Sequence, residues 1–154
     1  MVALKRFRFR LQKYLNLKQQ EESMRRINLA RAQQLYQKQE DVMRSIQKEL
    51  GNALARMREA RQGGLDLDLI TMSEYYLRVQ KEQQVRQAAV LEEARAELLR
   101  RQQEFVNVQK DRKLLERFYD RLWSAYYREF LREEQKNLDE VGLIRFFRQQ
   151  EEPV

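Results

Sequence analysis

The sequence at residues 29–60, LARAQQLYQKQEDVMRSIQKELGNALARMREA, decides the fold. Apolar side chains recur in it every seven residues, and a second series follows three residues after each. The two series are Leu29, Tyr36, Met43, Leu50 and Met57, and Ala32, Gln39, Ile46, Ala53 and Ala60. Such a repeat is the seam of a coiled coil, and Gln39 is its one polar member.

The same register reaches back toward the start of the chain. Leu4, Leu11 and Leu15 belong to it, whereas Leu17, Gln20, Met24 and Ile27 form a seam offset by two positions. A slip of this kind changes the local winding of a coiled coil without ending it. Because no Pro or Gly precedes Gly51, we expect one helix from about residue 4 to residue 61.

The seam ends at residues 62–68, QGGLDLD. Gly63 is suited to the left-handed C-terminal cap of the first helix. Asp66 or Asp68 is suited to capping the next helix, and residues 71–74, TMSE, offer a capping box as an alternative start. We expect a turn at about residues 62–67, which is short enough to make the two helices antiparallel neighbours.

A second seam follows the turn. It runs through Ile70, Leu77, Gln84, Leu91, Leu98, Phe105, Arg112, Tyr119 and Tyr126, with Ala94, Val108, Leu115 and Leu122 at companion positions. The pattern predicts a helix from about residue 68 to residue 148. A fold near residue 65 then brings Leu4 opposite Tyr126. We therefore expect an all-α protein of one domain over residues 1–154, an antiparallel coiled-coil hairpin whose second helix is the longer.

Composition argues against catalysis. The 154 residues include four Gly, one Pro, no Cys and no His, and 36% are charged, which is typical of long helices. His is the commonest general base, and both His and Cys are common metal ligands. The pair Gly63-Gly64 lacks the spacing and the lysine of a phosphate-binding loop. We expect a protein that is not an enzyme and that has no cofactor or metal.

The net charge of +7 is concentrated at the start of the chain. Residues 1–31 hold nine basic and two acidic residues, a net of +7, and the other 22 basic and 22 acidic residues cancel. This pattern favours contact between one end of the molecule and an acidic partner over general nucleic-acid coating, although a solvated basic face has the same composition. No stretch is apolar enough to span a membrane, and we expect a cytoplasmic protein.

The predicted hairpin leaves residues 127–148 without a partner helix. This overhang nevertheless carries eight large apolar side chains: Phe130, Leu131, Leu138, Val141, Leu143, Ile144, Phe146 and Phe147. An exposed apolar patch of that size indicates an interaction site. The alternatives are that the overhang packs on the start of the first helix in another register, or that it self-associates.

Stretches near both ends of the chain resemble the flagellar FliJ family. Residues 7–15, FRFRLQKYL, are similar to the family's F-x-F-x-L-x-x-(hydrophobic)-L start. Residues 113–116, KLLE, then Tyr126-Tyr127 and residues 134–140, EQKNLDE, are similar to its K-x-x-E, Y and E-Q-K-x-x-D-E pattern. The length, the two-helix layout and the mid-chain break agree with the family, whereas Phe146-Phe147 matches no family motif.

The resemblance implies a component of the flagellar type III export apparatus that resembles the central-stalk γ subunit of rotary ATPases. The implied partners are the hexameric export ATPase, the export gate in the membrane and substrate-loaded chaperones. The residues expected to bind the ATPase are Arg6, Phe7, Arg8, Arg10, Lys13, Lys113, Glu116, Tyr126, Phe130, Asp139 and Glu140. Tyr75, Tyr76 and Val79 are expected to bind the gate, or alternatively to cover the end of the seam.

Other functions are compatible with the same sequence pattern. A generic structural coiled coil is one, for example the stalk of a virulence-type secretion system. Phe7, Phe9 and Tyr14, which lie among basic residues, also suit base stacking or an amphipathic helix on a membrane surface. Neither of these accounts for a hairpin of this length. A dimeric four-helix bundle uses similar patterning, so self-association stays open.

Overall fold

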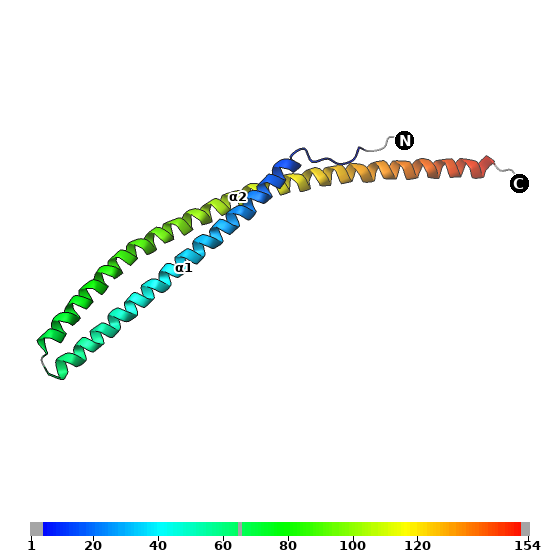
Figure 1. The fold of residues 1–154 in the computed structure, drawn as a ribbon. Coiled ribbons are helices and arrows are strands. Elements are labelled where there is room, and N and C mark those ends of the chain that lie inside the picture. Colours follow the sequence, from blue (N-terminus) through cyan, green and yellow to red (C-terminus); the bar gives the residue numbers. More distant parts are fainter. Residues whose placement is uncertain (1–4, 65, 152–154) are drawn as a thin grey trace. The chain divides into compact units, whose positions relative to one another are not determined.

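The computed structural model describes residues 5–64 and 66–151, and these residues form two helices (Figure 1). Helix α1 spans Gln12–Gln62 and helix α2 spans Leu67–Glu151. The described residues include no strand. The predicted fold class is confirmed: the protein is all-α, its two helices contact each other as a hairpin, and the second helix is the longer.

Helix α1 begins at Gln12, later than the expected start near residue 4. Residues 5–9 have no regular secondary structure, and a turn at residues 10–11 leads into the helix. There the backbone amide of Gln12 donates to the carbonyl oxygen of Phe9 at 3.1 Å. Lys5, Arg6, Arg8 and Arg10 would otherwise occupy the first helical turns, where the positive end of the helix dipole disfavours cations.

The alternation of aromatic and basic residues also disfavours a helix at residues 5–10, KRFRFR. Side chains two positions apart lie on the same side of a non-helical, strand-like chain, but about 200° apart on a helix. Phe9 is buried and Phe7 is half-buried, whereas Arg6 and Arg8 are exposed. The non-helical segment therefore turns both rings inward and both guanidinium groups outward.

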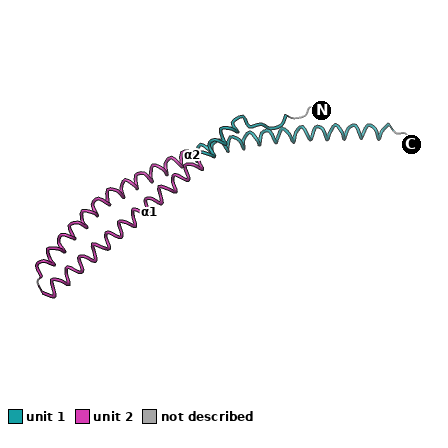
Figure 2. Tube along the Cα trace, in the orientation of Figure 1, with its two compact units in different colours: residues 1–20, 109–154 teal, residues 21–108 magenta. Residues whose placement is uncertain are grey.

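The chain forms two compact units, shown in different colours in Figure 2. Unit 1 consists of residues 1–20 and 109–154, and unit 2 consists of residues 21–108. Unit 2 is the helical hairpin with its turn. In unit 1 the N-terminal segment and the first turns of α1 lie beside α2, while the last part of α2 has no other segment of the unit beside it (Figure 2).

The seam of unit 2 is the face that the heptads predict. Its least exposed apolar side chains are Ala32, Ala53, Leu77 and Ala94, each only 7 or 8% exposed. All four occupy predicted seam positions. Among the described residues no side chain is completely buried, because each helix of a two-helix hairpin is covered on one face only.

Polar contacts across the seam confirm that the chain folds back near residue 65. The side-chain amide of Gln87 donates to the side-chain oxygen of Gln39 at 2.8 Å and to its backbone oxygen at 3.0 Å. The polar exception in the first seam is thereby satisfied by a polar residue of the second. Closer to the turn, the hydroxyl of Tyr76 lies 3.5 Å from the carboxylate of Glu49.

The predicted slip of the seam at residues 17–27 is wrong. Met24 and Ile27 are 65% and 54% exposed, whereas Glu22, in the main register, is only 4% exposed. Glu22 accepts from the guanidinium of Arg26 at 3.2 Å. Arg25, the next seam residue, is paired with Glu104 of α2 at 3.0 Å. Because Glu22 and Arg25 have charged partners, they can occupy the seam, and the main register continues through this stretch. The apolar side chains of the expected offset seam, such as Met24 and Ile27, face outward instead.

The turn uses the second glycine rather than the first. Gly64 has a φ of +115°, and the backbone amide of Gly63 donates to the carbonyl oxygen of Glu59 at 3.2 Å. Of the three predicted starts of α2 the structure uses Asp66, whose carboxylate accepts from the backbone amides of Asp68 at 3.1 Å and Leu69 at 3.3 Å. The expectation that Gly63 has the left-handed conformation is therefore corrected to Gly64.

The two glycines should respond differently to alanine. Gly64→Ala forces a Cβ onto a positive φ and should lower the free energy of unfolding by about 1 kcal/mol or more. In Gly63→Ala the new Cβ meets only the oxygen of Glu59 at an ordinary 3.7 Å, so the change should be neutral or slightly stabilising. Urea unfolding followed by circular dichroism measures both. Equal effects would contradict the assignment of the turn.

Candidate functional site

Aromatic side chains gather in unit 1 where the N-terminal segment lies on α2. This aromatic cluster consists of Phe7, Phe9, Phe118, Tyr119, Trp123 and Tyr126. The ring centroid of Phe7 lies 5.1 Å from that of Trp123, and the ring centroid of Phe9 lies 5.1 Å from that of Tyr119. Both pairs are edge-to-face, the arrangement that the aromatic quadrupole favours. The rings therefore hold the N-terminal segment on α2.

The cationic side chains of this segment face away from the rings. Arg6, Arg8, Arg10 and Lys13, which we call the basic arm, are all exposed. Within the described part of the chain none of them has a carboxylate at ion-pair distance. Further along unit 1, Lys18 forms an ion pair with Asp111 of α2 at 3.4 Å. Arg6, Arg8 and Arg10 of the basic arm are thus solvated cations on a segment that the aromatic cluster fixes in place, and Lys13 follows in the first turn of α1.

A second row of rings continues along α2. Trp123 stacks on Tyr127 with ring centroids 6.3 Å apart, and Tyr127 stacks on Phe130 at the same spacing. The three side chains stand three or four residues apart, so they share one side of the helix. They are 42%, 48% and 39% exposed. This stacked row links the covered aromatic cluster to an apolar surface that is open to solvent.

The apolar overhang is exposed, as the sequence predicts. Beyond Phe130 its large apolar side chains, from Leu131 to Phe147, are between 44% and 62% exposed. In the described structure the N-terminal segment contacts rings only as far as Tyr126. The alternative that the overhang packs on the start of the first helix is therefore excluded for these residues. Partner binding and self-association remain as its explanations.

The structure does not bring all the predicted ATPase-binding residues together. Phe7 and Tyr126 meet in the aromatic cluster with ring centroids 5.3 Å apart. Lys113 and Asp139 each lie thirteen residues along α2 from Tyr126, which is about 20 Å in each direction. Lys113 and Asp139 therefore lie on α2 to either side of the contact between Phe7 and Tyr126.

These charged family residues have local partners or face solvent. Glu116 accepts from Arg112 at 2.7 Å, and Asp139 accepts from the side-chain amide of Gln135 at 2.9 Å. Lys113 and Glu140 are exposed. Pairs of this kind on a helix surface contribute a few tenths of a kcal/mol.

An exposed apolar patch lies next to the turn of unit 2. It includes two predicted gate-binding residues and two that sequence reasoning missed: Tyr75, Tyr76, Leu69 and Met72. Met72 is 73% exposed and Tyr75 is 61% exposed. The guanidinium of Arg78 lies 5.4 Å from the ring centroid of Tyr75. Val79 is half-buried. The spacing of Leu69 and Met72 with Tyr76 is the sequence signal that marks all of them as one helix face.

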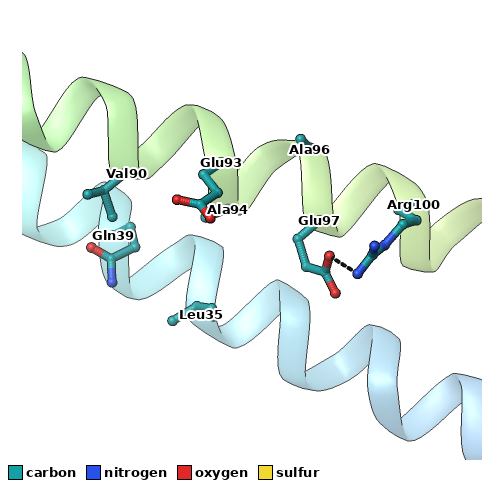
Figure 3. Close-up of a pocket in the computed structure, with 8 residues that line it drawn as sticks. All are labelled: Leu35, Gln39, Val90, Glu93, Ala94, Ala96, Glu97 and Arg100. Atoms are coloured by element: carbon teal, nitrogen blue, oxygen red, sulfur yellow. Dashed lines mark ion pairs between the residues drawn. The ribbon is translucent and has the colours of Figure 1, made fainter.

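A shallow groove lies between the two helices of unit 2. Its lining residues, drawn in Figure 3, are Leu35, Gln39, Val90, Glu93, Ala94, Ala96, Glu97 and Arg100. Hydrogen bonds from Arg100 and Arg101 hold the pKa of the Glu97 carboxyl below its usual value. Glu97 therefore stays ionised at neutral pH in a surface ion pair.

The described residues include neither a metal site nor a membrane-spanning helix. No group of His, Cys, Asp or Glu among them has the arrangement of a metal site. None of the helical stretches that the structure describes combines the length and the apolar character needed to cross a bilayer. The notable surfaces of the described chain are thus the basic arm, the apolar overhang and the patch beside the turn.

The two contacting helices define an all-α coiled-coil hairpin protein. A family model described as "Flagellar FliJ protein" matches residues 7–151 of the sequence. This chain belongs to the FliJ family, and it is a coiled-coil protein associated with type III export. The predicted family is thereby confirmed, and it is a family of structural and escort proteins.

A solved structure has the same fold. A putative YscO homolog from Chlamydia trachomatis is 19% identical, with a TM-score of 0.57, and the alignment covers 95% of this chain and 99% of that chain. No curated protein matches the sequence.

Loss of the two anchoring rings should release the N-terminal segment. In Phe7→Ser/Phe9→Ser, trypsin should cleave after Arg8 and Arg10 about tenfold faster, because release no longer requires the rings to leave the cluster. The emission of Trp123, the only tryptophan, should shift to longer wavelength. Phe146→Ser/Phe147→Ser removes two rings from the same unit and should leave both measurements unchanged. An unchanged cleavage rate in the first variant would mean that the rings do not hold the segment.

Proposed function

We propose that this protein is the stalk of the flagellar export ATPase. In this role it binds the hexameric ATPase, promotes its assembly and activity, and couples it to the export gate and to export chaperones. We place it in the cytoplasm, peripherally associated with the membrane export apparatus. One observation carries the proposal: the basic arm, whose solvated cations stand on a segment anchored by the aromatic cluster.

The chemistry of the basic arm suits an acidic ring opening. Guanidinium groups present several fixed donors to carboxylates, and charge-assisted hydrogen bonds are stronger than neutral ones. Arg6, Arg8 and Arg10 are exposed and lie within five residues of each other. Because the rings of Phe7 and Phe9 already fix the segment, binding loses less conformational entropy than it would from a free tail.

The stacked row Trp123, Tyr127 and Phe130 supplies the apolar part of the same contact. Exposed aromatic side chains beside arginines are the residue types that dominate the energetics of protein interfaces. These rings are partly exposed and adjoin the aromatic cluster within unit 1. We propose that the ring of the ATPase covers them while its carboxylates meet the basic arm.

The patch beside the turn is the proposed contact with the export gate. Met72 and Tyr75 are its most exposed members, whereas Tyr76 also contacts Glu49 of α1. Because Tyr76 is partly engaged with α1, Tyr75 is the tyrosine more accessible to a partner. The patch belongs to unit 2 and the basic arm to unit 1, so the two contacts use different parts of the chain.

Among the three rings considered for base stacking, Tyr14 is 47% exposed, whereas the contacts of Phe7 and Phe9 argue against stacking by these two. A stacking platform needs an open ring face, but Phe9 is 8% exposed and the ring of Phe7 contacts three rings of α2. The same contacts keep both rings away from a membrane surface. Between a flagellar and a virulence-type stalk, the matching family model favours the flagellar one.

Neutralising the basic arm should weaken ATPase binding and stimulation. Arg6→Gln/Arg8→Gln/Arg10→Gln should reduce the affinity for the export ATPase about tenfold at low salt, and the difference should shrink as salt screens the remaining charges. The measurements are ATP hydrolysis and equilibrium binding. The matched control, Arg56→Gln/Arg58→Gln/Arg61→Gln, removes three exposed charges from unit 2. Unchanged stimulation by a folded arm variant, or equal losses in both, would count against the proposal.

Removing the rings of the patch should affect gate binding alone. Tyr75→Ala/Tyr76→Ala should lower the affinity for the cytoplasmic domain of the gate about tenfold or more, since tyrosines that become buried in an interface are frequent hot spots. Binding to the ATPase should stay as in the wild type. Val85→Ala/Leu99→Ala, two exposed apolar residues of the same helix, is the control. Parallel loss of both partners, with reduced helicity, would identify the tyrosines as structural only.

A further inference from the structure

One stretch of the helix seam is charged on the side of α1. The seam positions of α1 between Leu15 and Leu29 are occupied by Lys18, Glu22 and Arg25. Residues 16–28, about 20 Å of helix, therefore contribute no apolar side chain to the seam. From residue 21 onward this stretch belongs to unit 2, so the hairpin of unit 2 has a charged seam at the end opposite its turn.

Ion pairs take the place of apolar contacts in this part of unit 2. The carboxylate of Glu104 on α2 accepts from Arg25 of α1 at 3.0 Å and from Arg101 of its own helix at 3.2 Å. Arg101 also donates to Glu97 at 2.8 Å. The side chains of Arg25 and Glu104 are 40% and 33% exposed, so the ion pair that joins the helices is open to solvent.

Arg26 provides a second contact between the helices in the same stretch. Its guanidinium lies 5.8 Å from the ring centroid of Phe105 on α2, and it also donates to Glu22 of its own helix at 3.2 Å. The side chain of Arg26 is 67% exposed. Exposed ion pairs and exposed contacts between a cation and a ring both contribute little to stability, so the helices are held weakly here.

The rest of the hairpin is held by contacts of another kind. Ala32, Ala53, Leu77 and Ala94 are each 7 or 8% exposed, and the favourable free energy of such apolar contacts does not depend on charge. Salt screens a solvent-exposed ion pair and weakens it. The two ends of unit 2 should therefore differ both in stability and in their response to salt.

We propose that residues 21–28 of α1 and 97–105 of α2 form a salt-sensitive joint, at which the two helices separate locally while the heptads nearer the turn stay packed. The ion pair of Arg25 with Glu104 controls this separation. When the joint opens, both side chains become hydrated and Arg101 keeps Glu97 as its partner, so no charge is left buried and unpaired. This inference goes beyond the proposed function, because it needs neither the basic arm nor the patch beside the turn.

Hydrogen exchange of the full chain, measured by mass spectrometry, tests the proposal. After correction for intrinsic rates, the amides of residues 21–28 should exchange faster than those of residues 43–57, because a helical segment without tertiary packing unfolds readily. Raising the NaCl concentration from about 0.1 M to about 1 M should accelerate exchange at residues 21–28 about threefold or more. Exchange at residues 43–57 should become no faster.

Variants of the ion pair identify the cause of the salt dependence. Arg25→Leu/Glu104→Leu replaces the two charges by apolar side chains and should abolish the salt dependence at residues 21–28. Glu104→Gln removes the carboxylate that Arg25 pairs with and should accelerate exchange there about threefold at low salt. The matched control, Gln39→Leu/Gln87→Leu, removes an uncharged pair across the same seam and should keep the wild-type salt dependence.

Spin labels distinguish separation of the helices from fraying of one helix. Since the sequence has no Cys, Ile27→Cys/Gln102→Cys places one label on each helix at the joint, at exposed positions. Ser45→Cys/Gln83→Cys does the same nearer the turn. At high salt a second, longer distance should appear for the first pair alone. A single unchanged distance for both pairs would show that the helices do not separate.

Three results of the exchange measurements would also overturn the proposal. One is exchange at residues 21–28 that is no faster than at residues 43–57. Another is an equal acceleration of both stretches by salt, which would mean that the hairpin opens as a whole. The third is a salt dependence that survives in Arg25→Leu/Glu104→Leu. ATPase stimulation is a separate measurement, so failure of the joint leaves the proposed stalk function standing.

Discussion

The packing of one seven-residue stripe against another is the interaction on which the structure of unit 2 depends. Its seam is so thin that its best-buried side chains include small residues such as Ala32 and Ala94. Apolar burial alone specifies the register weakly in so thin a core. Pairs such as Gln39 with Gln87 add specificity, since any slip would leave partly buried polar groups without a partner.

Much of this fold follows from the sequence because the heptad signal is repeated many times. Leu77 and Ala94 are buried at the predicted positions, and Asp66 caps α2 as its side-chain type suggests. The register at Glu22 was not predictable from hydrophobicity, because the burial of a carboxylate depends on partners. Gly63 and Gly64 both tolerate a positive φ, so the sequence does not distinguish which of the two adopts it.

The sequence identified several residues of the candidate site, but it did not show how these residues are arranged in space. The family-like motif led to Phe7, and the heptads led to Tyr119 and Tyr126, but the sequence did not show that these rings meet. That contact depends on a non-helical segment, whereas the spacing of Leu4, Leu11 and Leu15 had predicted a helix there. Met72 was missed for a different reason: an exposed apolar residue outside the seam becomes significant only when its neighbours in space are known.

The non-helical conformation of the N-terminal segment is what lets it both anchor and bind. On a helix, Arg8 would project about 200° away from Arg6 and about 160° away from Arg10, on the opposite side from both. In the non-helical segment at residues 5–9 the side chains of Arg6 and Arg8 project on the same side about 7 Å apart, and the rings of Phe7 and Phe9 face α2. The helix dipole, which disfavours cations in the first turn, thus helps to produce a one-sided row of cations.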